Sequence, residues 1–458
     1  MRSRGQTIAA VRQRLNETLF REPPATAAGD RLPALLIGGG LFALAILLQM
    51  LRVGWSPSLH SLWAEDGAVY LSGAVHNGFG GSLFDTYATY LVFVPRLIAE
   101  LADLFPLDDA PAVLTVLSCA VVALSGLIVW FASRGLIESP YLRGALALLI
   151  VLAPVGGLES TASAAYVPWY MLFATFWILL WRPQTALVAL GAGVFALLTG
   201  MSSPGVWFFI PLALLRTLAS RDGRDTLLLA GYWAGALVQL PVLILNDETA
   251  VTPQWTHDIW TDYLERVVAG AVLGLRLAGK IWEQVGWAFL IVLLALAIVA
   301  LVYGISRTSF SARLFALIAI PTSLVMFVVS VYQRAVGTEM IWPDGHYIES
   351  AGRYAIVPAM LLVSVAAVML DRRSRRRETE GRPRWLAYAA VAGALVVVAV
   401  SFRVENVELR GAPPWEAALD HGAEVCATEA GATESPIPTS PPGWGLNVPC
   451  SQLTSFGP

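Results

Sequence analysis

Long uncharged apolar segments recur along this chain and constrain its fold more than any other feature. The first runs from residue 32 to residue 51, about the 20 residues that a helix needs to cross a bilayer. Ten more lie at about 110–132, 143–156, 164–181, 185–200, 204–218, 226–245, 286–304, 312–332, 354–370 and 385–402. Charged residues make up only 14% of the sequence, against about 25% in globular proteins. The sequence therefore predicts an all-α polytopic membrane protein with about eleven transmembrane helices.

The arginines predict how these helices are oriented, because loops rich in Lys and Arg stay on the cytoplasmic side. With an odd number of spans and the N-terminus inside, the arginine-rich tail 1–31 and the arginine-rich run 372–384 both become cytoplasmic. The predicted transmembrane domain is then 32–402, with exterior loops at 53–109, 246–285 and 334–352 and an exterior tail at 403–458. The excess of Arg over Lys, with much Ala, Gly, Val and Leu, favours a bacterial inner (plasma) membrane.

The exterior tail is short and rich in Pro and Gly, so we expect only a small cap from it. Cys426 and Cys450 both lie in this tail. An oxidising exterior permits a disulfide between them, and two free thiols are the alternative. Cys119 lies inside a predicted span, where it is most simply a small apolar core residue.

An acidic pair, Glu65-Asp66, follows directly on the first span, in the first exterior loop. One of these carboxylates could act as a general base on an attacking hydroxyl. The pair could instead hold Mg²⁺ or Mn²⁺, which prefer oxygen ligands. The structural alternative is that Asp66, which precedes a glycine, caps a turn or an interfacial helix.

Two exterior arginines, Arg96 and Arg353, are predicted at membrane depth, where a cation without a partner is costly. The arginine fork binds phosphate through two hydrogen bonds, so both are candidates for holding a lipid phosphate. The alternatives are ion pairs with Glu100 or Glu349, or side chains that extend to the interface. His346 lies in a loop near Arg353 and is a candidate acid–base or sugar-binding group, although a lone loop histidine is more often a plain surface residue.

Several short motifs resemble those of the bacterial integral-membrane glycosyltransferases of the GT-C superfamily. The matching stretches are Trp63-Ala-Glu65-Asp66-Gly67-Ala-Val-Tyr70, Tyr87-Ala-Thr-Tyr90 with Pro95-Arg96-Leu97, Ser350-Ala-Gly352-Arg353-Tyr354 with Pro358, and Glu159 ahead of Val167-Pro168-Trp169. The resemblance implies a GT-C-like fold with interfacial helices in the first exterior loop. It also implies a polyprenyl-phosphate-linked sugar as donor and a glycan or lipid as acceptor.

By matching position, the resemblance gives the role of base or metal ligand to Asp66, with Glu65 second. It makes Arg96, Arg353, Glu159, Tyr87, Tyr90 and Tyr354 candidates for binding substrate or phosphate. The sequence hypothesis is an inverting transferase in which Asp66 deprotonates the acceptor hydroxyl. It expects no cofactor beyond a divalent ion, contact with membrane lipids, and no nucleic-acid partner.

A different class, a transporter or flippase of a lipid-linked or anionic substrate, shares the span count and the arginines. Transporters often show inverted repeats and polar groups near the bilayer midplane, whereas the charges here gather at the outer edge. A third class is a non-catalytic assembly partner of another membrane enzyme. That class predicts that Glu65 and Asp66 tolerate substitution.

Overall fold

The computed structural model describes residues 2–22, 31–157, 160–220, 222–245, 255, 259–334, 352–380, 385–402 and 414–453. Within these ranges, six helices are long and apolar enough to cross a membrane, and five shorter apolar helices accompany them. Each of the predicted apolar segments falls on one of these helices. The protein is an all-α polytopic membrane protein, which confirms the predicted fold class.

The helices of the bundle are joined by short helical turns. The first half comprises α1 (Arg2–Thr18), α2 (Arg31–Val53), α3 (Trp55–His60), η2 (Asp66–Leu71), α4 (Ser72–Asn77), α5 (Phe93–Ala102), η3 (Leu107–Asp109), α6 (Ala110–Ala132), η4 (Ser133–Gly135), α7 (Pro140–Leu152), η5 (Ala164–Tyr166), α8 (Val167–Leu180), α9 (Ala186–Ser202), η6 (Pro204–Phe209) and α10 (Ile210–Ala219). The second half comprises α11 (Gly223–Leu245), α12 (Ile259–Asp262), η7 (Tyr263–Ala269), α13 (Gly270–Leu273), α14 (Leu275–Val285), α15 (Trp287–Arg307), α16 (Phe310–Arg334), α17 (Arg353–Thr379) and α18 (Trp385–Val400).

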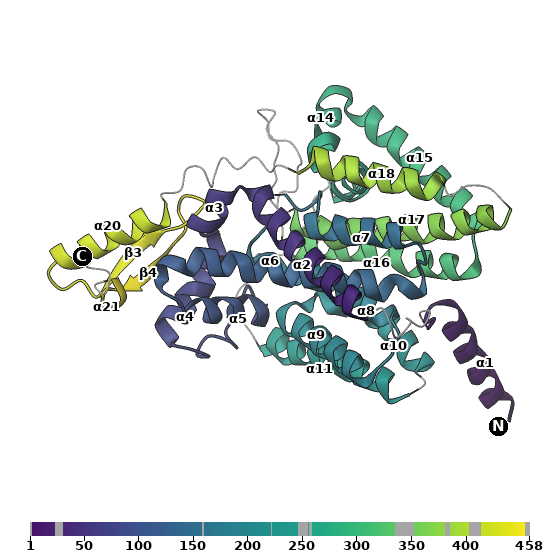
Figure 1. Cartoon of the computed structure of the whole chain (residues 1–458), viewed down its shortest axis with the longest axis horizontal. Coiled ribbons are helices and arrows are strands. Elements are labelled where there is room, and N and C mark those ends of the chain that lie inside the picture. Colours follow the sequence, from purple (N-terminus) through teal and green to yellow (C-terminus); the bar gives the residue numbers. More distant parts are fainter. Residues whose placement is uncertain are drawn as a thin grey trace.

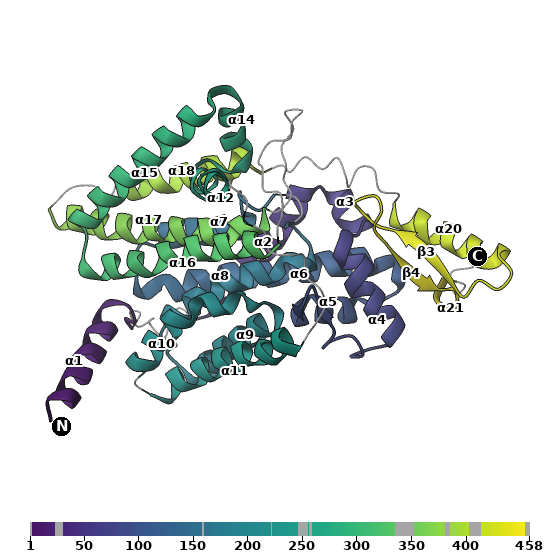
Figure 2. The same ribbon diagram turned by 180° about the vertical axis from the view of Figure 1, so that it is seen from behind.

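Helix α8 lies in the middle of the bundle (Figures 1 and 2). Apart from Trp169, all of its residues are buried, because a helix that is apolar on every side belongs in an interior. It packs against α6, α9 and α17, and Trp177 stacks on Phe315 of α16 with ring centroids 5.6 Å apart. The packing of α8 fixes the position of its first turn, which bears on the candidate site.

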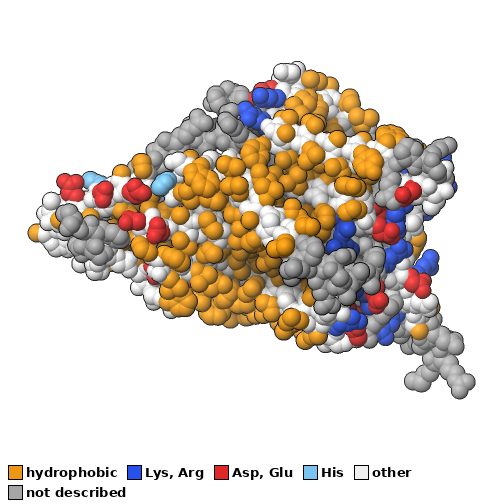
Figure 3. Space-filling model, viewed as in Figure 1, with side chains coloured by type: hydrophobic (Ala, Val, Ile, Leu, Met, Phe, Trp, Pro, Cys, Tyr) orange, Lys and Arg blue, Asp and Glu red, His pale blue; other side chains and the backbone are white. Residues whose placement is uncertain are grey.

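The two ends of the bundle differ in charge. Helix α1 lies at one end and the C-terminal residues lie at the other (Figures 1 and 2). Apolar side chains cover the middle of the face shown in Figure 3, Lys and Arg gather at the α1 end, and Asp and Glu mark the opposite tip. The ends of α15 and α17, with Arg307 and the run 372–376, reach the α1 end. We call the opposite end the cap end.

The first loop after α2 is compact and contains a β-hairpin that the sequence reading missed. Interfacial helices are the only elements predicted for this loop, but β1 (Thr86–Tyr87) pairs antiparallel with β2 (Tyr90–Leu91) before α5 begins. The buried side chain of Gln239 in α11 binds both the N–H and the carbonyl of Leu91. This tertiary contact with α11 explains why the strand forms in an otherwise helical loop.

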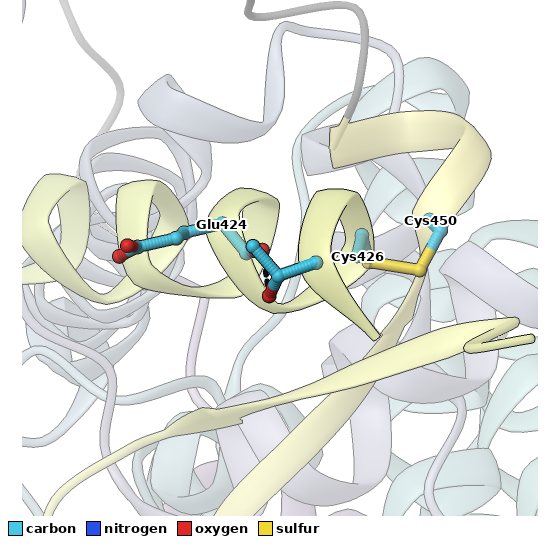
Figure 4. The surroundings of a disulfide bond; sticks show 4 residues. Glu424, Cys426 and Cys450 are labelled. Atoms are coloured by element: carbon cyan, nitrogen blue, oxygen red, sulfur yellow. Dashed lines mark hydrogen bonds between the residues drawn. A yellow bond between two sulfur atoms is a disulfide. The ribbon is translucent and has the colours of Figure 1, made fainter. Parts of the chain in front are cut away.

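Residues 414–453 form a small unit at the cap end, which we call the C-terminal cap. It consists of α20 (Trp415–Thr428), an antiparallel hairpin of β3 (Glu434–Pro438) and β4 (Gly445–Pro449), and α21 (Cys450–Leu453). Ile437 and Val448 of the hairpin are fully buried. A disulfide joins Cys426 of α20 to Cys450 of α21 (Figure 4), while Cys119 is a free, buried thiol in α6.

Candidate active site

Asp66 is a buried carboxylate, 4% exposed, at the first position of η2. Its Oδ1 accepts the N–H of Ala165 at 2.9 Å, and its Oδ2 accepts the N–H of Ala164 at 3.1 Å. Both donors belong to η5, the turn that leads into α8, so Asp66 caps the start of the central helix from a distant segment. The structural alternative from the sequence is therefore present, although the helix that Asp66 caps is not an interfacial one.

Burial also changes the acidity of this carboxylate. It raises the pKa of Asp66 from 3.8 to about 7, while the N–H groups of Ala165 and Ala164 and the Ser163 hydroxyl act in the opposite direction. The charge of Glu65 adds to the rise. A carboxylate whose pKa lies near 7 can accept a proton at neutral pH and release it again, which is what general-base catalysis requires.

Asp66 lines a small pocket that opens to solvent, about 400 Å³ including its mouth. The pocket lies between the end of α2, α3, α6 and the segment 161–163. Its lining residues are Val53, Pro57, Ser58, Ser61, Leu62, Trp63, Asp66, Leu114, Thr115, Thr161, Ala162 and Ser163. The buried carboxylate therefore forms part of the wall of this pocket.

Glu65 turns away from this pocket toward a second group of side chains. The Tyr166 hydroxyl donates to Oε2 of Glu65 at 3.3 Å, and Nη1 of Arg353 donates to the same hydroxyl at 3.4 Å. The Arg353 guanidinium lies 5.2 Å from the Tyr166 ring centroid and 4.9 Å from that of Tyr354, and Trp169 packs edge-on against Tyr354. We call these five residues the Arg353 cluster.

The Asp66 pocket and the Arg353 cluster are both held by the same short helical turn, η5. Asp66 is bonded to the first two residues of η5, and the third residue of η5, Tyr166, connects Glu65 to Arg353. Arg353 is the first residue of α17 and is half-buried. Two adjacent acids and one cation from a distant segment therefore meet at η5, at the cap end of α8, where the helix dipole favours negative charge.

Arg96 lies on α5 and is mostly committed to the first loop. Its Nε donates to the carbonyl of Asp85 at 2.8 Å, and its Nη2 donates to the carbonyl of Thr86 at 3.3 Å. The expected partner Glu100 instead accepts hydrogen bonds from Gly80 and Ser82. This geometry favours a structural role for Arg96, and its binding of a phosphate stays a prediction.

Tyr70, which lies one turn beyond Asp66 in η2, is the residue that connects Arg96 to the predicted tyrosines of the hairpin. The guanidinium of Arg96 is 5.7 Å from the Tyr70 ring centroid, and Tyr87 packs edge-on against that ring at 6.1 Å. Burial, followed by the proximity of Tyr90 and Glu65, raises the pKa of Tyr70. Tyr87 and Tyr90 therefore lie close to Tyr70, on the hairpin side of η2.

The described residues offer little to a divalent ion. No group of three or more His, Cys, Asp or Glu side chains within metal-binding reach occurs among them. Both oxygens of Asp66 already accept a backbone N–H, and Glu65 faces Tyr166. The pair alone therefore does not fit the oxygen cage that Mg²⁺ or Mn²⁺ prefers, and the chemistry proposed below runs through no metal.

Two predicted site residues, Glu159 and His346, lie outside the described residues. Conversely, the sequence reading missed Tyr166 and Ser163, which contact Glu65 and Asp66 respectively. One signal was available, because Tyr166 immediately precedes the Val167-Pro168 start of an apolar helix. Residues at the end of a span, opposite an acidic loop, are candidates for contact with that loop.

The chain matches no protein-family model and no curated protein. Among solved structures, it is similar to the crystal structure of the Archaeoglobus fulgidus oligosaccharyltransferase, described as a complex with Zn and sulfate. The identity is 13%, the TM-score is 0.40, and the match covers 85% of this chain. The chain spans 55% of the length of that protein. A likeness at this level assigns neither a substrate nor a residue role to this chain.

Proposed function

We propose that this membrane protein is a glycosyltransferase that moves a sugar from a polyprenyl-phosphate donor to an acceptor hydroxyl at its cap end. The observation that carries the proposal is the meeting of Asp66 and Arg353 on one helical turn. Asp66 is a buried, pocket-lining carboxylate with a pKa of about 7, and Arg353 is joined to the neighbouring acid through Tyr166. A base and a phosphate-binding cation are what this transfer requires.

Each residue has one role in the proposed reaction. Arg353 binds the phosphate of the donor, with its guanidinium held between the rings of Tyr166 and Tyr354. Asp66 takes the proton of the acceptor hydroxyl as that oxygen forms a bond to the anomeric carbon. The bond from the anomeric carbon to the phosphate oxygen breaks, and the polyprenyl phosphate leaves with its electron pair. One such displacement inverts the anomeric configuration.

The proposed orientation puts the cap end outside and the α1 end in the cytoplasm of a bacterial cell. The charge distribution supports this assignment, because arginines gather at the α1 end (Figure 3) and such charges remain on the cytoplasmic side. The disulfide in the C-terminal cap fits an oxidising exterior. Lipid-linked sugars presented on the outer leaflet would then lie level with Arg353.

The direct test is transfer by the protein in nanodiscs, supplied with a panel of polyprenyl-phosphate sugars and hydroxyl acceptors. Asp66→Asn should lower kcat roughly 10²- to 10⁴-fold, the usual contribution of a general base. Asp109→Asn removes an exposed acid from the same loop and should leave turnover unchanged. For the wild-type protein, kcat/KM should rise about tenfold per pH unit below pH 7 and then level off, because the ionised form of Asp66 is the base.

Two outcomes would count against this proposal, the first against its mechanism and the second against the activity itself. Near-normal turnover of Asp66→Asn would remove Asp66 as the base. Failure of the wild-type protein to transfer any sugar of the panel, combined with movement of lipid-linked sugar between the leaflets of vesicles, would favour the transporter class.

A further inference from the structure

The segment that carries the acidic pair is paired with the opposite end of the chain. Thr439 and Ser440, which follow β3 in the C-terminal cap, lie across the segment that carries the acidic pair. We call these two residues the strap. The Ser440 N–H donates to the carbonyl of Leu62 at 2.9 Å, and the Ala64 N–H donates to the Ser440 carbonyl. These bonds form a short parallel bridge beside Trp63. The strap therefore binds the backbone on the N-terminal side of Glu65.

The strap also closes on the C-terminal side of the pair. A Cβ placed on Gly67 would lie 2.6 Å from Cγ2 of Thr439, so a larger residue at position 67 would have to displace this methyl group. Thr439 is 4% exposed and Ser440 is fully buried. The strap thus contacts the residues before and after Glu65-Asp66 and leaves the two acids themselves turned toward η5.

Further contacts fasten the rest of the cap to the first loop. The indole of Trp415 in α20 donates to the carbonyl of Leu107 at 2.8 Å and is itself buried. Two histidines of the loop face two glutamates of the cap, His60 with Glu416 and His76 with Glu434, each at 3.4 Å. The disulfide joins the two helices of the cap. The strap therefore belongs to a unit anchored on both sides of the acidic segment.

We propose that the C-terminal cap is a positioning element of the active site, with Thr439 and Ser440 holding the Glu65-Asp66 segment against the start of α8. The site is thus assembled from both ends of the chain. This inference rests on the proposed function for its effect on turnover, but not for its effect on the local backbone. Thr439 and Ser440 act through the backbone of residues 62–67 and touch no substrate.

A compensating pair of substitutions tests the strap. Gly67→Ala inserts a methyl group where Cγ2 of Thr439 now lies, and Thr439→Ser removes Cγ2. The nearest remaining atoms, Cβ of Thr439 and Cβ of Leu62, would be 3.5 Å from the new methyl group, an ordinary contact. Gly40→Ala is the control, because nothing lies within 4 Å of its added Cβ.

The first readout is hydrogen exchange of the peptide that covers residues 62–68, measured on the full chain in nanodiscs. Gly67→Ala should speed exchange of this peptide on the order of tenfold, because the Ala64 N–H loses its partner in the strap. The double variant Gly67→Ala/Thr439→Ser should exchange at the wild-type rate again. The control variant Gly40→Ala should exchange at the wild-type rate throughout. If this peptide exchanged in Gly67→Ala at the wild-type rate, the strap would not hold the segment and the proposal would be overturned.

The second readout is turnover. Gly67→Ala should lower kcat about tenfold or more with little change in the donor KM, since the strap touches the Asp66 segment and not Arg353, and the double variant should recover. Faster exchange with unchanged kcat would overturn the positioning role. If the wild-type protein transferred no sugar, the proposed function would fail, while the exchange comparison would still decide whether the strap holds the segment.

Discussion

At the scale of single residues, Asp66 combines two opposing influences on one carboxylate. Two backbone N–H groups favour its charged form, while burial favours the neutral form and prevails, bringing the pKa to about 7. A carboxyl that served only as a helix cap would gain most from a low pKa, because the charged form accepts hydrogen bonds more strongly. Burial explains the raised pKa of Asp66, and a pKa near 7 suits the proposed proton transfer better than it suits capping alone.

The same shift predicts how stability depends on pH. Because the pKa of Asp66 is raised above its unfolded value of 3.8, the folded protein holds a proton that the unfolded chain releases between about pH 4 and pH 7. This contribution is fully present below pH 4, is lost as the pH rises through 7, and amounts to about 4 kcal/mol. The thermal midpoint in detergent should fall between pH 5 and pH 8, and should fall less in Asp66→Asn. Equal falls in both proteins would contradict the raised pKa.

Glu65, Asp66 and Arg353 could be selected as candidate site residues from the sequence. Each lies next to an apolar span, where a charged side chain is costly without a partner. Their connection through Tyr166 could not be predicted, since the bond from Arg353 to Tyr166 joins residues 187 positions apart. Arg96 shows the limit of the same argument. Its charge was predicted to face a ligand, and its nearest hydrogen-bond acceptors are carbonyls of its own loop.

At the scale of elements, α9 and α11 cross with their backbones in contact. A Cβ on Gly193 would lie 2.6 Å from the carbonyl oxygen of Leu227, and a Cβ on Gly200 would lie 2.4 Å from the backbone of Gly235. Glycines permit such close approach of helices inside membranes, where packing replaces the hydrophobic driving force. This crossing positions Gln239 of α11, which holds the β1–β2 hairpin beside Tyr70.

Two neighbouring glycines of α9 give a matched test of this crossing. Gly193→Ala should lower stability by about 2–3 kcal/mol, because the methyl group meets backbone that cannot yield. Gly191→Ala meets nothing within 4 Å and should be neutral or slightly stabilising. Thermal unfolding in detergent measures both, and equal midpoints for the two variants would refute close packing at Gly193.

The helices could be predicted from apolar length, but the hairpin could not. Its turn residues, Ala88 and Thr89, have φ values of 53° and 79°, a left-handed conformation that usually calls for Asn or Gly. Their identities gave no turn signal, and the strand is held by a contact with the distant helix α11. The strap could not be predicted from the sequence either, because it pairs segments that lie far apart along the chain.

At the scale of the whole molecule, an apolar middle separates an arginine-rich end from an acidic cap (Figure 3). An odd number of crossings is needed to put α1 and the C-terminal cap on opposite sides of the membrane. The six long helices and five shorter ones satisfy this requirement if all of them cross. In the proposed orientation, the site and the disulfide would both lie on the outer side.

Cysteine labelling of intact cells tests this orientation. On a Cys119→Ala background, Val11→Cys in α1 and Glu429→Cys after α20 both place a thiol at an exposed position. A membrane-impermeant maleimide should modify position 429 in intact cells, and position 11 only after permeabilisation. Labelling of both positions from outside, or of position 11 alone, would contradict an odd number of spans with the N-terminus inside.

The most direct measurement of the central claim is an experimental structure of the Asp66→Asn protein with a polyprenyl-phosphate sugar bound. We expect the donor phosphate within hydrogen-bond distance of the Arg353 guanidinium, with the anomeric carbon facing the pocket lined by residue 66. A donor bound elsewhere, with no contact between its phosphate and Arg353, would contradict the account. It would leave Asp66 as the buried cap of α8 and nothing more.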